Sequence, residues 1–203
     1  MDNKTIKMVY IDDRPEPALS EFLDKYINPM CDIQSEEDIT FNPDVDEYND
    51  LIQNPTVTGA NIIIIDSMLF ENRNQTNKLT GEEFKLVLRK QFPFIEVIVV
   101  TQKYNNGEID IVSKYASQKN KEITPAAYYK NILTPILDEA VHKIVDFRKI
   151  ENKIKNNVSI EKVLIEKITD SLNGIANYDD LTKSDIDKIV KMFQEIQEAI
   201  NER

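Results

Sequence analysis

Three aspartates stand at the ends of short apolar runs. Asp12 and Asp13 follow the run at 8–11, and Asp66 follows the run at 62–65. Continuous apolar runs of this length are typical of strands inside a parallel sheet that is covered on both faces. The carboxyl ends of such strands meet along one edge, where α/β proteins bind their ligands. Three carboxylates held there repel one another, so the pattern predicts a site for a hard divalent cation such as Mg2+.

Two further residues are expected at the same edge. The apolar run at 97–100 ends on Thr101, and a fifth strand is predicted over 109–114, ending on Lys114. Only about six residues separate Thr101 from this strand, fewer than the dozen that a crossover helix needs. The sequence therefore predicts two neighbouring strands without a helix between them.

Helical spacing of apolar residues alternates with these strands. It predicts a second strand within 30–41 and helices from Pro17 to Pro29, over 44–53, from Thr80 to Pro93 and from Thr124 towards Phe147. Pro135 is expected to kink the last helix or to restart it at Thr134. This alternation is typical of an α/β fold with a doubly wound, parallel, five-stranded sheet.

A helical extension is predicted beyond the α/β domain. From Lys149 onward there is no strand signal, and apolar residues at helical spacing predict helices over 159–174 and 184–200. Such short amphipathic helices must pack on each other, on the first domain or on a second copy of the chain. We therefore divide the chain into an α/β domain over 1–148 and an output or dimerisation element over 149–203, a homodimer being one of these three arrangements.

Composition limits the classes of function. The 203 residues carry a net charge of −11, which disfavours binding to nucleic acid or to an anionic membrane. A single cysteine, Cys31, and a single histidine, His142, exclude an internal disulfide and a His/Cys zinc cage. No run approaches the roughly 20 apolar residues that cross a bilayer, and the N-terminus lacks the layout of a signal peptide. We expect a cytoplasmic protein that binds a protein partner.

The order of these motifs resembles that of the response-regulator receiver domain, the phosphoacceptor domain of two-component signalling. The resemblance covers roughly residues 5–147. It rests on five segments in the right order, namely Ile-Asp-Asp-Arg-Pro at 11–15, Ile-Asp-Ser-Met at 65–68, Thr-Gly-Glu-Glu-Phe at 80–84, Val-Val-Thr at 99–101 and Asp-Ile-Val-Ser-Lys at 110–114. It implies a flavodoxin-like fold and a phosphorylation switch rather than an enzyme with multiple turnover.

The resemblance also implies a role for each site residue. Asp66 would be the phosphoacceptor, and Thr101 and Lys114 would contact the phosphoryl group. The implied ligands of Mg2+ are Asp12, Asp13, Asp66 and the backbone carbonyl of Met68. A histidine kinase or an effector protein would be the partner.

The sequence departs from the family pattern in several places. The proline expected after the phosphoacceptor is missing from 69–71, the loop at 71–78 is longer than usual, and the fourth helix of the family is absent. The aromatic residue expected three positions before the lysine is Ile111. Lys119 or Lys121 would replace Lys114 if the fifth strand began later.

Three functions are compatible with these residues. The three mutually repelling carboxylates favour a phosphoreceiver, because a phosphorylation-independent adaptor has no physical reason to keep them. The departures favour the adaptor. A lysine that already fills the gap between the carboxylates as their cation would exclude the phosphorylation switch and leave only the adaptor. A Mg2+-dependent phosphohydrolase of the haloacid dehalogenase type is disfavoured, because Met68 stands where that chemistry needs a second aspartate.

Overall fold

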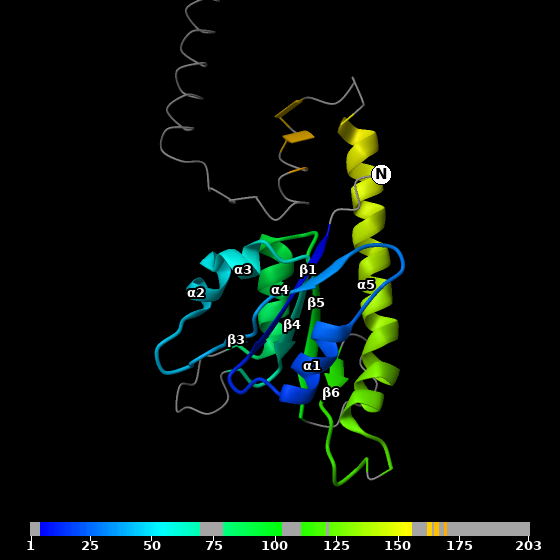
Figure 1. The fold of residues 1–203 in the computed structure, drawn as a ribbon. Coiled ribbons are helices and arrows are strands. Elements are labelled where there is room, and N and C mark those ends of the chain that lie inside the picture. Colours follow the sequence, from blue (N-terminus) through cyan, green and yellow to red (C-terminus); the bar gives the residue numbers. More distant parts are fainter. Residues whose placement is uncertain are drawn as a thin grey trace, which may run out of the picture.

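The computed structural model describes residues 5–69, 79–102, 111–120 and 122–155, together with 162, 163, 165, 166 and 169. Its strands are β1 (Ile6–Asp12), β2 (Ile33–Ser35), β3 (Ile39–Thr40), β4 (Ile62–Asp66), β5 (Glu96–Thr101) and β6 (Ile111–Ser113). Its helices are α1 (Pro17–Lys25), α2 (Tyr48–Gln53), α3 (Pro55–Thr58), α4 (Gly81–Gln91) and α5 (Pro125–Lys155). Figure 1 shows the strands side by side in one sheet, with the long helix α5 running along it.

The sheet is parallel throughout its described pairs, in the order β2-β1-β4-β5-β6. The edge position beside β1 holds two segments, because β2 pairs at Ile6↔Ile33 and β3 pairs at Ile11↔Ile39. The strand predicted within 30–41 is therefore present but interrupted at 36–38. From β1 the chain first adds β2 on one side, and then adds β4, β5 and β6 in turn on the other side. This switch point between β1 and β4 defines the flavodoxin-like, doubly wound fold that the sequence predicted.

Alternate residues of each central strand face opposite layers. In β1, Met8 and Tyr10 lie in the core beneath α1 and α5, whereas Val9 and Ile11 lie in the core beneath α2, α3 and α4. The runs in β4 and β5 divide in the same way. A strand with helices on both faces has no solvent side, which explains why these segments are apolar without interruption.

Strands β5 and β6 pair directly although little chain joins them. Val99 pairs with Ile111 and Thr101 pairs with Ser113, in parallel. The connection at 102–110 is shorter than the dozen or so residues that a helical crossover needs. Residues 103–110 lie outside the described part of the chain, so the predicted lack of a helix there stays a prediction.

Two predicted helices differ from the observed ones. The helix expected over 44–53 begins only at Tyr48, because the side chain of Asp50 accepts the backbone N–H of Glu47 and caps it there. The short helix α3 then follows, capped by the side chain of Asn54.

Helix α5 continues through Pro135 and does not restart at Thr134. Leu133 and Leu137, on either side of this proline, are both fully buried, and this packing holds both halves against the sheet. The proposed boundary at 148/149 falls within α5. Of the helix predicted over 159–174, the described residues 162, 163, 165, 166 and 169 are helical. The rest of that helix, the helix predicted over 184–200 and the loop at 71–78 lie outside the described residues, so the division into domains stays a prediction. None of the helices in the described ranges has the length and apolar content to span a bilayer.

The burial of α5 can be tested with one pair of variants. Leu133→Ala should lower the free energy of unfolding by about 2–5 kcal/mol, because Leu133 is 0% exposed and its removal leaves a cavity. Leu86→Ala, the same chemical change at a residue that is 68% exposed, should stay within about 0.5 kcal/mol of the unmodified protein. Urea denaturation measures both values. Equal effects would contradict the placement of α5 against the sheet.

Candidate functional site

The three predicted aspartates meet at the carboxyl edge of the sheet. Asp12 and Asp66 are the last residues of β1 and β4, and the pairing of Ile11 with Ile65 places them side by side. Each of Asp12, Asp13 and Asp66 offers a carboxylate oxygen within 4.8 Å of the other two. The expected convergence of these side chains is therefore observed, and their donor set is the all-oxygen kind that Mg2+ prefers.

Burial makes this cluster electrostatically costly. Asp12 is 1% exposed and Asp66 is 3% exposed, while Asp13 is only partly buried. Burial raises the pKa of Asp66, and the ammonium of Lys114 offsets part of that rise. Burial and repulsion from Asp12 and Asp66 raise the pKa of Asp13. Burial would also raise the pKa of Asp12, but hydrogen bonds from Lys114 and Tyr10 outweigh it and hold that pKa below its ordinary value.

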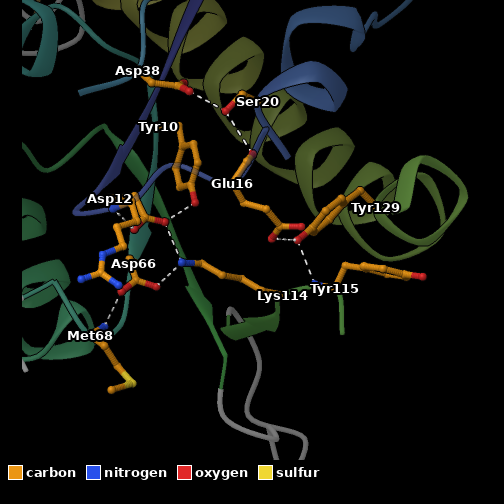
Figure 2. A network of polar contacts seen from close by, with 11 residues as sticks. Tyr10, Asp12, Glu16, Ser20, Asp38, Asp66, Met68, Lys114, Tyr115 and Tyr129 are labelled. Carbon is orange, nitrogen blue, oxygen red and sulfur yellow. Dashed lines mark hydrogen bonds and ion pairs between the residues drawn. The ribbon is translucent and has the colours of Figure 1, made fainter. Parts of the chain in front are cut away.

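Lys114 supplies an internal cation to the cluster (Figure 2). Its Nζ lies 2.6 Å from Oδ2 of Asp12 and 2.6 Å from Oδ1 of Asp66. Its side chain is only 6% exposed. A lysine therefore does lie between Asp12 and Asp66, the arrangement that counts against a phosphorylation switch. One ammonium balances only one of the three carboxylates, however, and Arg14 lowers the pKa of Asp13 only in part. With these two positive groups counted, the three carboxylates keep an excess of one negative charge.

The structure also distinguishes Lys114 from Lys119. Lys119 is exposed in the turn after β6, and Lys121 lies outside the described residues. The backbone N–H of Lys114 donates to the carbonyl of Thr101 over 2.6 Å, which fixes Lys114 at the end of β6.

Backbone amides orient the two buried carboxylates. Oδ1 of Asp12 accepts the N–H of Arg14 at 2.9 Å, and Oδ2 of Asp66 accepts the N–H of Met68 at 2.8 Å. The hydroxyl of Tyr10 donates to the same Asp12 oxygen that receives Lys114. Met68 thus contacts the site through its amide, and the predicted use of its carbonyl as a metal ligand stays a prediction.

Thr101 lies at the end of β5, the strand next to β4. It is buried, and its neighbour Val100 pairs with Asp66. This is the strand-end position that the sequence predicted, while the contact of its hydroxyl with a phosphoryl group stays a prediction. Ile111, which replaces the aromatic residue of the family, is partly buried against the core beneath α4.

Helix α4 begins directly against the backbone of the phosphoacceptor candidate. The N–H of Gly81 donates to the carbonyl of Ser67 at 2.9 Å, and the hydroxyl of Ser67 donates to Glu82 at 2.6 Å. A Cβ at position 81 would lie 2.3 Å from the carbonyl oxygen of Asp66. Thr80 and Glu83 form the predicted capping box, but the need for glycine between them arises from a tertiary contact.

Sequence reasoning missed several polar residues that contact the site aspartates or the segments that carry them. Tyr10 contacts Asp12 from within its own strand, and Glu16, in the turn after it, accepts a hydrogen bond from Tyr129 of α5. A tyrosine inside an otherwise aliphatic strand was the available signal, because a buried phenolic hydroxyl requires a partner. The pairing of Glu16 with Tyr129 joins residues far apart in the chain and left no local signal.

No known family profile and no curated protein sequence matches this chain. Similar solved structures include the BeF3-activated DrrB receiver domain, with 14% identity, covering 68% of this chain and 98% of that chain at a TM-score of 0.40. A two-component transcriptional regulator AraC from Clostridium phytofermentans has 16% identity, covering 71% and 98% at a TM-score of 0.41. The two-component response regulator RcsB in complex with DNA has 17% identity, covering 86% and 94% at a TM-score of 0.38.

These similar structures are receiver proteins, the family that the sequence resembles. Identities this low define no activity for the present chain, and its fold is defined by its own strand order. The RcsB structure contains DNA, so the expectation that this chain does not contact nucleic acid gains no support from these similarities and stays a prediction.

The close contact at Gly81 can be tested by a change that usually stabilises helices. Gly81→Ala should destabilise the protein by about 1–3 kcal/mol, because the added methyl group meets the backbone of Asp66. Gly→Ala at a compatible helical position normally gains about 0.4–1 kcal/mol. Gly59→Ala is the comparison variant: its Cβ would lie 3.0 Å from the Pro55 carbonyl, a tight contact but a smaller clash away from the site, so it should destabilise the protein less than Gly81→Ala. A stabilised Gly81→Ala protein would contradict the contact.

The charge balance predicts the pH dependence of a Lys114→Met variant. Removal of the ammonium should cost about 3–5 kcal/mol of unfolding free energy near neutral pH, because two buried carboxylates lose their partner. In the unmodified protein the lowered pKa of Asp12 contributes stability that is lost as the pH falls through it. The variant lacks that contribution, so the difference between the two proteins should shrink on acidification.

Urea denaturation across the acidic and neutral range measures this difference. Lys130→Met, at an exposed position of α5, is the matched control and should behave like the unmodified protein. A difference that stays constant with pH would show that Lys114 contributes packing rather than charge.

Proposed function

We propose that this protein is a signal-transduction regulator in which Asp66 accepts a phosphoryl group in the presence of Mg2+. The observation that supports this most is the cluster of Asp12, Asp13 and Asp66, whose carboxylate oxygens lie within 4.8 Å of one another while Lys114 contacts two of them. The three carboxylates carry more negative charge than Lys114 neutralises, and they lie at the carboxyl edge of a parallel sheet. Such a site suits the joint binding of Mg2+ and a phosphoryl group.

Asp66 is the nucleophile in this proposal. One of its carboxylate oxygens attacks phosphorus, and the bond from phosphorus to the leaving group of the donor breaks, with the electron pair departing on that group. The product is an acyl phosphate on Asp66. The N–H of Met68, which donates to Oδ2 of Asp66, holds the carboxylate in one orientation before the attack.

Asp12, Asp13, Asp66 and the Met68 carbonyl would hold the Mg2+. When bound, the ion neutralises the carboxylates and the phosphoryl oxygens, which otherwise repel each other. The residues fit such an ion, because all the side-chain donors are oxygen and Asp13 remains partly accessible.

Lys114 and Thr101 act on the phosphoryl group once it is present. The ammonium of Lys114 already contacts Asp66, so a small movement transfers that contact from the carboxylate to a phosphoryl oxygen. The phosphoryl group adds nearly two negative charges, which strengthens its attraction to the ammonium. Thr101 reaches the same edge from β5 and provides a hydroxyl donor.

The partners we propose are a histidine kinase as donor and an effector protein as target, within a cytoplasmic two-component pathway. The net charge of −11 supports a protein target over nucleic acid. We expect no multiple turnover of a phosphomonoester, since the position two residues after Asp66 holds Met68 in place of an acid–base group.

A second candidate function is a phosphorylation-independent adaptor. The ion pairs from Lys114 to Asp12 and Asp66 favour it, because they stabilise much of the cluster without a metal. In that case the α/β domain presents a fixed surface to its partner, and Mg2+ binds weakly or not at all.

Intact-mass spectrometry after incubation with Mg2+ and a small phosphodonor distinguishes these functions. We expect a single phosphoryl adduct on the unmodified protein and none on Asp66→Asn, which keeps the side-chain shape but removes the nucleophile. Asp24→Asn changes an exposed aspartate of α1 in the same way and should keep the adduct.

Beryllofluoride with Mg2+ should also raise the thermal stability of the unmodified protein and leave Asp66→Asn unchanged. Metal binding without an adduct would support the adaptor. An adduct that persists in Asp66→Asn would exclude Asp66 as the acceptor, and continuous release of phosphate from a monoester would indicate an enzyme.

A further inference from the structure

The backbone on both sides of Lys114 is tied to the first turns of helix α5. On one side the carbonyl of Ser113 accepts the hydroxyl of Tyr128 at 3.0 Å. On the other side the N–H of Tyr115 donates to the hydroxyl oxygen of Tyr129 at 2.8 Å. Two consecutive residues of one helix therefore hold the two neighbours of the site lysine.

The hydroxyl of Tyr129 has a second partner, in the segment between β1 and α1 (Figure 2). It donates to Oε2 of Glu16 at 2.5 Å, and Glu16 is the residue from which α1 starts. Glu16 lies four residues after Asp12, on the same turn as the amide of Arg14 that orients Asp12. A single phenolic oxygen thus joins the segment that carries Lys114 to the segment that carries Asp12.

The centre of this connection is buried, and its other members are partly buried. Tyr129 is 0% exposed, and its ring contacts Tyr128 and Phe22. The ring of Tyr128 in turn meets Tyr115 edge-on, with centroids 5.6 Å apart. These hydrogen bonds are partly buried, and each costs free energy to break, so Lys114 can move far only if these residues move with it or give up partners.

We propose that Tyr129, assisted by Tyr128, positions Lys114 and transmits a change in the contacts of Lys114 to the start of helix α5. The regulatory part of this inference rests on the proposed function, because binding of Mg2+ and a phosphoryl group at the site is what would change the contacts of Lys114. The usual aromatic position of the family holds Ile111, which cannot form a polar link to the site. Tyr128 and Tyr129 approach the site from α5 itself, the helix that leads towards the C-terminal extension.

The main experiment measures backbone hydrogen exchange of the full-length chain with and without Mg2+ and beryllofluoride. We expect the unmodified protein to show a change in exchange over the first turns of α5. Tyr129→Phe should bind beryllofluoride, as followed by thermal shift, but should lose this change in α5. Tyr128→Phe removes the weaker of the two links and should reduce it in part.

Tyr26→Phe is the matched control. Tyr26 is also a buried tyrosine whose hydroxyl donates to a carboxylate, Oδ1 of Asp138 in α5, at 2.6 Å. This link joins the end of α1 to α5 without touching Lys114, so its loss should leave the response of α5 intact. An unaltered response in Tyr129→Phe, or an equal loss in Tyr26→Phe, would overturn the proposal.

A double-mutant cycle tests the connection from Lys114 through Tyr129 to α5 even if beryllofluoride fails to bind. Lys114→Met changes the contacts of the lysine directly, and we expect it to alter exchange at the start of α5. In the Tyr129→Phe background this effect should be lost, because the connection is already cut. Equal effects of Lys114→Met in both backgrounds would overturn the proposal. If the effects of Lys114→Met and Tyr129→Phe are non-additive but the unmodified protein does not bind beryllofluoride, only the phosphoacceptor function is overturned.

Discussion

The burial of like charges at one edge of a parallel sheet is the constraint around which this structure is arranged. Asp12 and Asp66 are almost fully buried beside each other, with Asp13 next to them. An isolated buried carboxylate is strongly destabilising, and a pair is worse. The chain meets this cost with one ammonium, two backbone amides and one phenolic hydroxyl. These partners hold the pKa of Asp12 below its ordinary value but leave the pKa values of Asp66 and Asp13 raised, so the neutralisation is incomplete.

The elements around the cluster serve to hold those partners in place. The direct pairing of β6 with β5 brings Lys114 to the site, through a connection too short for a helix. Gly81 lets α4 begin against the backbone of Asp66, and Tyr129 braces the segments that carry Asp12 and Lys114. The same contacts that keep the charges together therefore also limit how the site can respond when its charge changes.

Most of the fold could be predicted because buried parallel strands leave a strong, local pattern. The runs at 62–65 and 97–100 are apolar since both sheet faces are covered, and their ends locate the aspartates and Thr101 without any further information. Other features depend on contacts between distant residues. The pairing of Glu16 with Tyr129, the steric need for Gly81 and the continuity of α5 through Pro135 result from tertiary packing, which no local pattern of the sequence encodes. The late start of α2 at Tyr48 reflects a capping contact of Asp50 that competes with the helical spacing before it.

The interruption between β2 and β3 has a consequence for how the molecule behaves in a crowded solution. The unpaired backbone groups of an edge strand are a template for intermolecular strand addition and for amyloid-like growth. At this edge the three residues of β2 are followed by the acidic segment 36–38 and then by the two residues of β3. An incoming extended chain would lose its ladder of hydrogen bonds at this break. The divided edge strand is therefore a poorer template for strand addition than an unbroken one, in a sheet whose interior is almost entirely aliphatic.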